Sequence, residues 1–301
     1  MSVRSACPAL DDRIARLRRI AHADDRLEGV LLYGSWTLGE ADTHSDIEAY
    51  LYVHDDRLPE FDGPAFLGQL SPLKLAYTNM YGILAVVFDD LMRGEFHLTA
   101  AGAGIEEVPT WRGMVHLPRP EDAVLLDRTG RLTRAARQLA EFRPPEPAVT
   151  AQQLTDESAN WTLMLAHVLA RGEIARAHAL LHTAVAPQQL QLCRLLRGRT
   201  AHWLTPSRAL EQDLPAADRD RYTATTSAAR EAEVRRAARE SWRWSRELAA
   251  EAADRWAVRL PYGLHDEISG LLDGPCRSRR PAPKLTVHAE VGGRTEVDGP
   301  S

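Results

Sequence analysis

The chain contains 301 residues, of which 44% are hydrophobic and 26% charged, which is ordinary composition for a globular protein with a sizeable core. Its formal net charge of −5 argues against the broadly basic surface of a nucleic-acid-binding protein, although local groups and a metal can still hold an anionic nucleotide. The three cysteines fit neither a metal motif nor a disulfide framework, no apolar run is long enough to span a membrane, and the N-terminus lacks the apolar core of a signal peptide. We therefore expect a cytoplasmic protein with no nucleic-acid or membrane partner.

The first half of the chain predicts a mixture of helices and strands. Residues 9–24 carry apolar side chains at helical spacing, and residues 29–33 form a short apolar run that indicates a buried strand. Residues 46–53 alternate strictly, which predicts a strand with Asp46 and Glu48 on the same face. We also predict a short helix at residues 35–39 and further strands at residues 73–77, 83–88, 96–99 and 122–127.

The second half of the chain predicts a bundle of about five helices. A proline-rich link over residues 143–148 precedes it, and from Trp161 onward apolar residues recur at helical spacing. Residues 276–301 are rich in Arg, Pro and Gly, which predicts a mostly disordered tail. The expected organisation is therefore one domain over residues 1–145, a helical domain over residues 146–275, and the tail.

One segment, residues 33–48, combines features that suit phosphate and metal chemistry. Gly34 has no Cβ, so the backbone can approach a phosphate closely, and Ser35 offers a hydroxyl and an N–H at a helix start. Asp46 and Glu48 lie two residues apart on a strand, about 7 Å along the chain, so both carboxylates point to one side. Such a pair suits Mg²⁺, which prefers hard oxygen ligands and shares its site with substrate phosphates.

Each feature alone is weak, but the Gly-Ser turn followed by ten residues and then Asp46-Ile47-Glu48 is more specific. The plain alternative is a surface strand with two solvated carboxylates beside an ordinary turn. In this segment the chain resembles the polymerase-beta-like nucleotidyltransferase superfamily. Residues 33–53, 80–99 and 171–176 further resemble the lincosamide nucleotidyltransferases of the larger, two-domain type.

The resemblance implies an α+β fold, with an N-terminal polymerase-beta-like nucleotidyltransferase domain built on a mixed sheet and a C-terminal helical bundle. It implies that Mg²⁺ is bound by Asp46 and Glu48, and that a homodimer transfers a nucleoside monophosphate from an NTP, with ATP the expected donor. The acceptor would be a hydroxyl of a lincosamide antibiotic, pyrophosphate would be released, and the role would be antibiotic resistance. Glu95 matches the family's third carboxylate, which is proposed as the general base.

Several of these residues have alternative interpretations. Glu95 can deprotonate an acceptor hydroxyl, or it can simply form an ion pair with Arg93. Ser45 can bind a phosphate through its backbone or cap the turn, and His97 can orient Glu95 or line the acceptor pocket. Candidate cations for the triphosphate are Arg171, Arg176 and Arg194, and the aromatic residues that favour a mixed acceptor pocket are Trp36, Tyr81 and Phe96.

Three other functions compete with the lincosamide interpretation. An aminoglycoside or other small-molecule adenylyltransferase would share the metal site but would need a more acidic acceptor pocket. A catalytically silent nucleotide-binding module would be expected to lack one of the three carboxylates, and all three are present. A toxin that modifies a protein or RNA is disfavoured by the acidic net charge and the large helical half.

Overall fold

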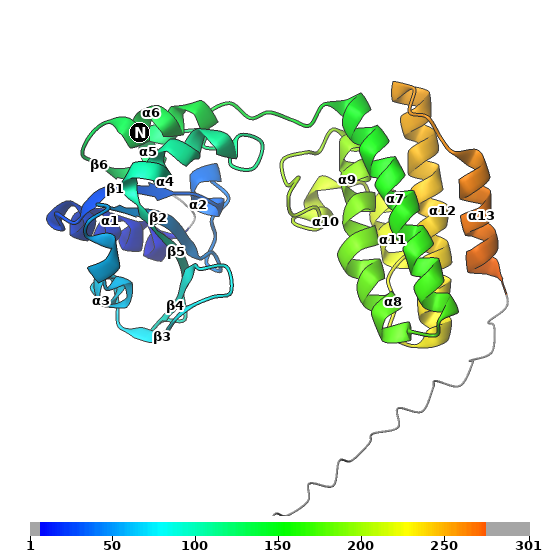
Figure 1. The fold of residues 1–301 in the computed structure, drawn as a ribbon, viewed down its shortest axis with the longest axis horizontal. Coiled ribbons are helices and arrows are strands. Elements are labelled where there is room, and N and C mark those ends of the chain that lie inside the picture. The colour runs from blue at the N-terminus through cyan, green and yellow to red at the C-terminus, as the bar shows by residue number, and fades with distance from the viewer. Residues whose placement is uncertain (1–6, 275–301) are drawn as a thin grey trace, which may run out of the picture. The chain divides into compact units, whose positions relative to one another are not determined.

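The computed structural model describes residues 7–274, and the chain folds as two compact units, one ending at Pro145 and the other beginning at Glu146 (Figure 1). The N-terminal unit contains a mixed sheet and the C-terminal unit is helical, so the predicted α+β class is confirmed. The predicted tail over residues 276–301 lies outside the described residues. None of the helices within residues 7–274 is both long and apolar enough to cross a membrane.

The N-terminal unit is built on a six-stranded sheet with the order β3-β4-β5-β2-β1-β6. Strands β2 and β5 pair in parallel at the centre, whereas the other neighbouring strands pair antiparallel. The strands are β1 (Leu27–Leu32), β2 (Ile47–Val53), β3 (Leu73–Thr78), β4 (Leu84–Phe88), β5 (Arg93–Ala100) and β6 (Val124–Asp127). The parallel pair brings together two strands that lie far apart in the sequence, and it is the pair that matters for the site.

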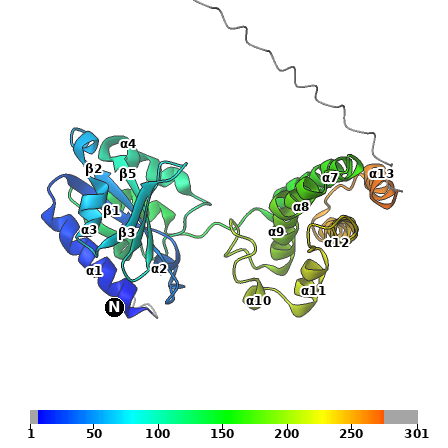
Figure 2. The same ribbon diagram turned by 90° about the horizontal axis from the view of Figure 1, so that it is seen from below.

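Helices α1 (Pro8–Ala23) and α3 (Gly63–Gly68) pack on one face of the sheet (Figure 2). Proline in the first turn of α1 suits a helix start, because its missing N–H would have no helical partner there. The buried face of α1 follows the predicted helical spacing, and it packs against alternate residues of the central strands. These buried residues include Leu10, Ile14, Leu17, Ala21, Ile47, Ala49, Leu51, Val86 and Phe96.

The opposite face of the sheet is covered over part of its area by short helices, of which α4 is visible in Figure 2. They bury Leu31 and Tyr52, which lie on the other side of the sheet from the α1 core. The helices are α4 (Ala101–Glu107), η2 (Val108–Trp111), α5 (Pro120–Ala123), α6 (Arg131–Ala136) and η3 (Arg137–Leu139). The remaining elements of this unit are α2 (Ser35–Leu38), between β1 and β2, and η1 (Leu58–Glu60).

Most elements of this unit agree with the sequence prediction to within a few residues, but β5 does not. It begins at Arg93, three residues before the predicted start at residue 96. Arg93, Gly94 and Glu95 were left outside the predicted strand, and pairing with β2 and β4 makes them part of it. The helices α3, α4 and α6 were not predicted, because each is too short to show a clear helical period.

The C-terminal unit is a helical bundle, as predicted. Its two longest helices, α7 and α12, pack against each other and against α9, and they enclose two apolar clusters that contain Trp242 and Trp244. The helical elements are α7 (Pro147–Ala170), α8 (Ile174–Leu180), the π-helical turn η4 (Leu181–Val185), α9 (Ala186–Arg197), α10 (Leu210–Asp213), α11 (Ala216–Ala224), α12 (Glu231–Trp256) and α13 (Tyr262–Asp273).

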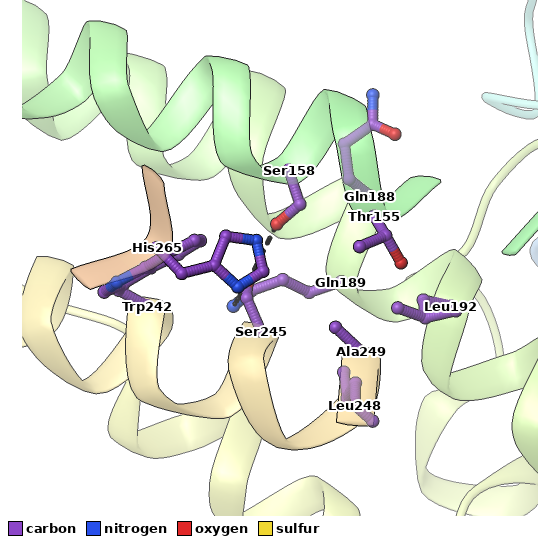
Figure 3. A pocket seen from close by; sticks show the side chains of 10 residues that line it. All are labelled: Thr155, Ser158, Gln188, Gln189, Leu192, Trp242, Ser245, Leu248, Ala249 and His265. Atoms are coloured by element: carbon purple, nitrogen blue, oxygen red, sulfur yellow. Dashed lines mark hydrogen bonds between the residues drawn. The ribbon is translucent and has the colours of Figure 1, made fainter. Parts of the chain in front are cut away.

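A small polar cavity of about 10 Å³ lies within this bundle (Figure 3). Ser245 Oγ accepts hydrogen bonds from Ser158 Oγ (3.0 Å) and Gln189 Nε2 (2.9 Å), and Thr155 and His265 also line the space. The volume suits about one water molecule and is far below the roughly 300 Å³ at which pockets for small-molecule ligands begin. The cavity therefore belongs to the packing of the bundle, and none of the predicted site residues lines it.

Arg194 is fully buried in α9 and holds the loop that follows this helix. Its guanidinium donates to Asp213 Oδ2 (2.7 Å) and to the carbonyls of Pro206 (2.7 Å), Arg199 (3.1 Å) and Arg208. Burial alone would raise the pKa of Asp213, but hydrogen bonds from Arg194 and His202 outweigh it and hold that pKa below its usual value. Arg194 was a candidate to contact the triphosphate, and this prediction is wrong. Its guanidinium is buried, and its N–H groups donate to partners inside the bundle.

We expect Arg194→Met to lower the free energy of unfolding by about 3–5 kcal/mol, because it removes the guanidinium partner of the Asp213 carboxylate and leaves three carbonyls without this donor. Denaturant titration followed by circular dichroism measures this loss. Arg199→Met, at an exposed residue of the same loop, is the matched control and should change stability by no more than about 0.5 kcal/mol. Equal losses in the two variants would contradict the anchoring role.

Candidate active site

The bend that follows β1 holds the two residues predicted to bind phosphate. The N–H of Tyr33 still donates to the carbonyl of Glu48 (3.2 Å), so the chain stays paired with β2 up to the bend. Gly34 then adopts φ 78° and ψ −156°, a conformation almost restricted to glycine, and its carbonyl accepts from Thr37 Oγ1 (2.8 Å). Ser35 is buried at the start of α2. Gly34 and Ser35 thus form a tight bend directly beside β2.

Gly34 also packs against the carboxylate of Glu48. A Cβ added at position 34 would lie 1.6 Å from Glu48 Oε2, so no other residue fits unless the carboxylate moves. By contrast, Gly39 at the end of the same short helix has φ 78° but no atom within 4 Å of an added Cβ. The glycine at position 34 is therefore required by a specific close approach as well as by its backbone conformation.

The parallel pairing of β2 with β5 brings the predicted carboxylates together. Glu48 is the register partner of Glu95, and Tyr50 is the partner of His97. Partners in neighbouring strands lie about 4.8 Å apart and point to the same side of the sheet. Asp46 immediately precedes β2 and lies two residues before Glu48, so it extends the same row of side chains. Asp46, Glu48 and Glu95 therefore share one face of the central strands.

Arg93 links two of these carboxylates. Its guanidinium lies 3.6 Å from Asp46 Oδ2 and 3.1 Å from Glu95 Oε1. The Arg93 side chain is 62% exposed, whereas those of Asp46 and Glu95 are 28% and 29% exposed. The ion pair between Glu95 and Arg93 that the sequence raised as an alternative therefore exists, and it lies within the acidic group. Because Arg93 is largely exposed, it can also reach an anion that binds beside the carboxylates.

Burial and the negative charge of all three carboxylates act on the pKa of the Tyr33 hydroxyl. Its pKa is raised above the ordinary value, first by burial and then by the negative charge of Glu48, with contributions from Tyr50, Glu95 and Asp46. Three carboxylates raise the pKa of one hydroxyl by charge repulsion only when all of them lie near it. The negative charge of the three carboxylates therefore disfavours ionisation of Tyr33 and favours its hydroxyl as a hydrogen-bonding group.

An aromatic cluster closes the site on the side toward α4 and η2. Tyr33 Oη and His97 Nε2 form a hydrogen bond of 3.0 Å, and the His97 ring stacks on Tyr50 with centroids 4.0 Å apart. Trp111 packs on the same Tyr50 ring at 4.6 Å. Burial lowers the pKa of His97, which favours the neutral imidazole. His97 is therefore held beside the acidic group by two direct partners, Tyr33 in the bend and Tyr50 on β2, and Trp111 supports the Tyr50 ring.

Ser45 occupies the tight loop that leads into β2. Its hydroxyl donates to Asp42 Oδ1 (3.2 Å) and accepts from the Asp42 N–H (2.9 Å). Asp42 also accepts from the N–H of His44 (2.8 Å), and these hydrogen bonds, the one from His44 first, lower the pKa of Asp42. The Ser45 side chain thus closes the loop just before Asp46. Its predicted contact to a nucleotide stays a prediction.

The chemistry of these residues fits a hard divalent cation shared with a substrate. No group of three or more His, Cys, Asp or Glu side chains in residues 7–274 is arranged to enclose a metal ion by itself. Mg²⁺ commonly binds through one or two carboxylates and completes its coordination with water and phosphate oxygens. Asp46 and Glu48, partly exposed on one face of β2, provide such a pair.

Sequence reasoning considered Arg93 only as an ion-pair partner of Glu95, did not assign Tyr33 a role, and misplaced two aromatic residues. If the predicted strand is extended back to Arg93, the alternation over residues 93–97 places Arg93 on the same face as Glu95. This alternation would have predicted that Arg93 belongs to the site. The same alternation sends Phe96 into the core under α1, so it cannot line an acceptor pocket. Trp36 is also buried in that core, where its indole N–H donates to Asp11 Oδ1 (2.8 Å).

Comparison with protein families identifies the helical unit. Residues 149–268 match the model of the lincosamide nucleotidyltransferase-like C-terminal domain. The resemblance expected from the sequence is thereby confirmed for this part of the chain, and the match supports a nucleotidyltransferase. No curated protein sequence shows a significant match to the chain.

Three solved structures are similar to the chain at low identity. An aminoglycoside 6-adenyltransferase from Bacillus subtilis is 14% identical, with 87% of this chain and 99% of that chain covered and a TM-score of 0.41. A nucleotidyltransferase-like protein from Exiguobacterium sibiricum 255-15 is 13% identical, with coverages of 80% and 77% and a TM-score of 0.35. A CCA-adding enzyme is 11% identical, with coverages of 89% and 72% and a TM-score of 0.32. Likenesses at this level do not define an activity.

We expect Gly34→Ala to lower the free energy of unfolding by at least about 3 kcal/mol, because the new methyl group collides with Glu48 in a backbone conformation that disfavours any side chain. Gly39→Ala, which meets only the left-handed backbone cost, should lose about 1–2 kcal/mol. Thermal and denaturant unfolding of both variants measures the difference. If Gly34→Ala were as stable as Gly39→Ala, the close packing of the bend on Glu48 would be disproved.

Proposed function

We propose that this chain transfers a nucleoside monophosphate from an NTP, with ATP the first candidate, to a hydroxyl of a lincosamide antibiotic and releases pyrophosphate. The observation that carries the proposal is the in-register pairing of Glu48 with Glu95, with Asp46 beside them and the Gly34 bend packed on Glu48. The family match of the helical unit supports the substrate class. A catalytically silent module has no need for three carboxylates on one face.

Asp46 and Glu48 would hold Mg²⁺. When bound there, the ion would neutralise charge on the triphosphate and hold it for in-line attack. The bend at Gly34 and Ser35 lies next to Glu48 and offers backbone N–H groups to phosphate oxygens. Arg93 supplies an exposed guanidinium in the same group, and a cation there stabilises the negative charge that develops on the leaving pyrophosphate.

Glu95 acts as the general base in this proposal. The acceptor oxygen attacks the α-phosphorus, its proton passes to the Glu95 carboxylate, and the bond between the α-phosphorus and the bridging oxygen breaks to release pyrophosphate. Glu95 is suited to this role because it lies on the strand next to β2 and remains 29% exposed. Tyr33 and His97 position the surrounding face through their hydrogen bond.

A homodimer belongs to the same proposal and rests on the sequence resemblance, and the cytoplasmic location rests on the cysteine usage and the apolar pattern of the sequence. A screen with ATP labelled in the α-phosphate tests the activity and the acceptor together. The full chain with Mg²⁺ is offered lincomycin, clindamycin and several aminoglycosides, and labelled product is separated from ATP. Label on a lincosamide supports the proposal, label on an aminoglycoside alone shifts it to the rival substrate class, and no label on any of them contradicts it.

We expect Asp46→Asn to reduce transfer by at least about 10²–10³-fold, because a neutral amide binds Mg²⁺ poorly and leaves the triphosphate charge unbalanced. The initial rate of pyrophosphate release, measured over a range of Mg²⁺ concentrations, reports the loss. Asp56→Asn, at an exposed carboxylate after β2, is the control and should keep the activity of the unmodified protein. A fully active Asp46→Asn variant would overturn the mechanism.

We expect Glu95→Gln to lower kcat by about 10²–10⁴-fold while the KM for ATP changes little, because the amide cannot accept the acceptor's proton. Steady-state kinetics with ATP and the acceptor varied in turn separate the two effects. Equilibrium binding of ATP to the variant provides the control for an intact nucleotide site. If KM for ATP rose while kcat stayed constant, Glu95 would be a nucleotide ligand and not the base.

A further inference from the structure

The face that carries the carboxylates continues across β4 to the edge strand β3. Glu95 is the register partner of Ala85 in β4, and Ala85 is the partner of Tyr77 in β3. A row of side chains on one face therefore runs from Tyr77 through Ala85 and Glu95 to Glu48.

A second row runs beside the first. Arg93 is the register partner of Val87, and Val87 is the partner of Leu75. Outside the charged residues, both rows consist of apolar side chains. We call this group, made of Leu75, Tyr77, Ala85 and Val87, the apolar shelf.

The apolar shelf is open at its β3 edge, whereas Val87 is half-buried and Ala85 is buried between Tyr77 and Glu95. Leu75 is 49% exposed and Tyr77 is 52% exposed, although both are large and hydrophobic. On the opposite face of β4, Leu84, Val86 and Phe88 are buried in the core under α1. Adjacent exposed apolar side chains beside a polar site are a common mark of a ligand-binding surface.

The order of the strands decides which substrate the shelf faces. From the sheet edge inward, the parts are the shelf on β3 and β4, Glu95 on β5, Asp46 and Glu48 at β2, and the bend after β1. The nucleotide is assigned to the metal-binding pair and the bend, which lie beyond Glu95. The substrate that meets Glu95 from the shelf side is therefore the acceptor. The aromatic cluster around Tyr50 lies further along β2 and β5, next to Glu48 and Glu95 in the strand direction.

The distances suit a small molecule with two chemically different ends. Tyr77 lies two strands from Glu95, which is about 10 Å. An acceptor whose hydroxyl reaches Glu95 can thus lay an apolar portion of ordinary drug size over the half-buried Val87 onto Leu75 and Tyr77. A uniformly polar, polycationic acceptor gains nothing from this surface.

We propose that the apolar shelf binds the non-polar portion of the acceptor, with Leu75 and Tyr77 as its specificity-determining residues. This inference rests on the proposed function, because it takes Glu95 as the base. It makes the acceptor an amphiphilic hydroxyl compound, and it puts the determinant of acceptor choice on the edge hairpin, apart from the charged residues.

The test compares two double variants of the same edge strand in the full chain. Leu75→Ser with Tyr77→Ser removes the shelf, and Ala76→Ser with Thr78→Ser changes exposed residues on the opposite face. With clindamycin as acceptor, the shelf variant should show a rise in acceptor KM of about tenfold or more, with the KM for ATP unchanged. The control variant should behave as the unmodified protein. Equilibrium dialysis gives the Kd for clindamycin without turnover.

Each outcome separates the two proposals. If the protein transfers label to clindamycin but the two variants have the same KM, the shelf is overturned and the function stands. If clindamycin binds but receives no label, and only the shelf variant loses binding, the shelf stands and the function fails. A rise in the KM for ATP instead would assign the shelf to the nucleobase. Neither binding nor transfer would overturn both proposals.

Discussion

The site depends on parallel pairing between β2 and β5, which holds Glu48 and Glu95 side by side although their negative charges repel. The other face of the same strands offsets this cost. Ile47, Ala49 and Phe96 point away from the carboxylates into the core under α1, so the strands cannot separate without exposing apolar area to water. Arg93 adds a partial counter-charge on the site face. A well-packed core on one side thus permits a concentration of like charge on the other.

Local pattern was enough to predict about half of this arrangement. The strict alternation of residues 46–53 places Asp46 and Glu48 together on a strand, and a two-residue period depends only on neighbours in the sequence. The helical spacing of α1 and of the bundle helices is equally local. The contact between Glu48 and Glu95 is different, because residues 54–92 separate the two strands and no local signal states that they pair in parallel.

The errors have a common physical origin, which is that residue type does not specify which face a side chain occupies. Phe96 was counted in favour of a mixed acceptor pocket because it is aromatic, yet it points to the face opposite Glu95, its neighbour in the strand. Arg194 was considered for phosphate because it is cationic, yet Leu192, Cys193, Leu195 and Leu196 around it are all buried, and a guanidinium in such a run must find its partners inside. In both cases the neighbours in the sequence held the better signal.

The strand order also places the carboxylates and the apolar shelf on different strands, so substitutions in one need not affect the other. The carboxylates lie on β2, on β5 and directly before β2, which are central strands whose other face is buried, so the backbone that carries them is fixed by the core. The apolar shelf ends on β3, an edge strand whose residues from Lys74 to Thr78 are exposed on both faces. Substitutions on β3 therefore cost little stability, since they leave no cavity and unpair no buried group. On this argument the surface proposed for acceptor choice can vary while the residues proposed for the chemistry stay constant.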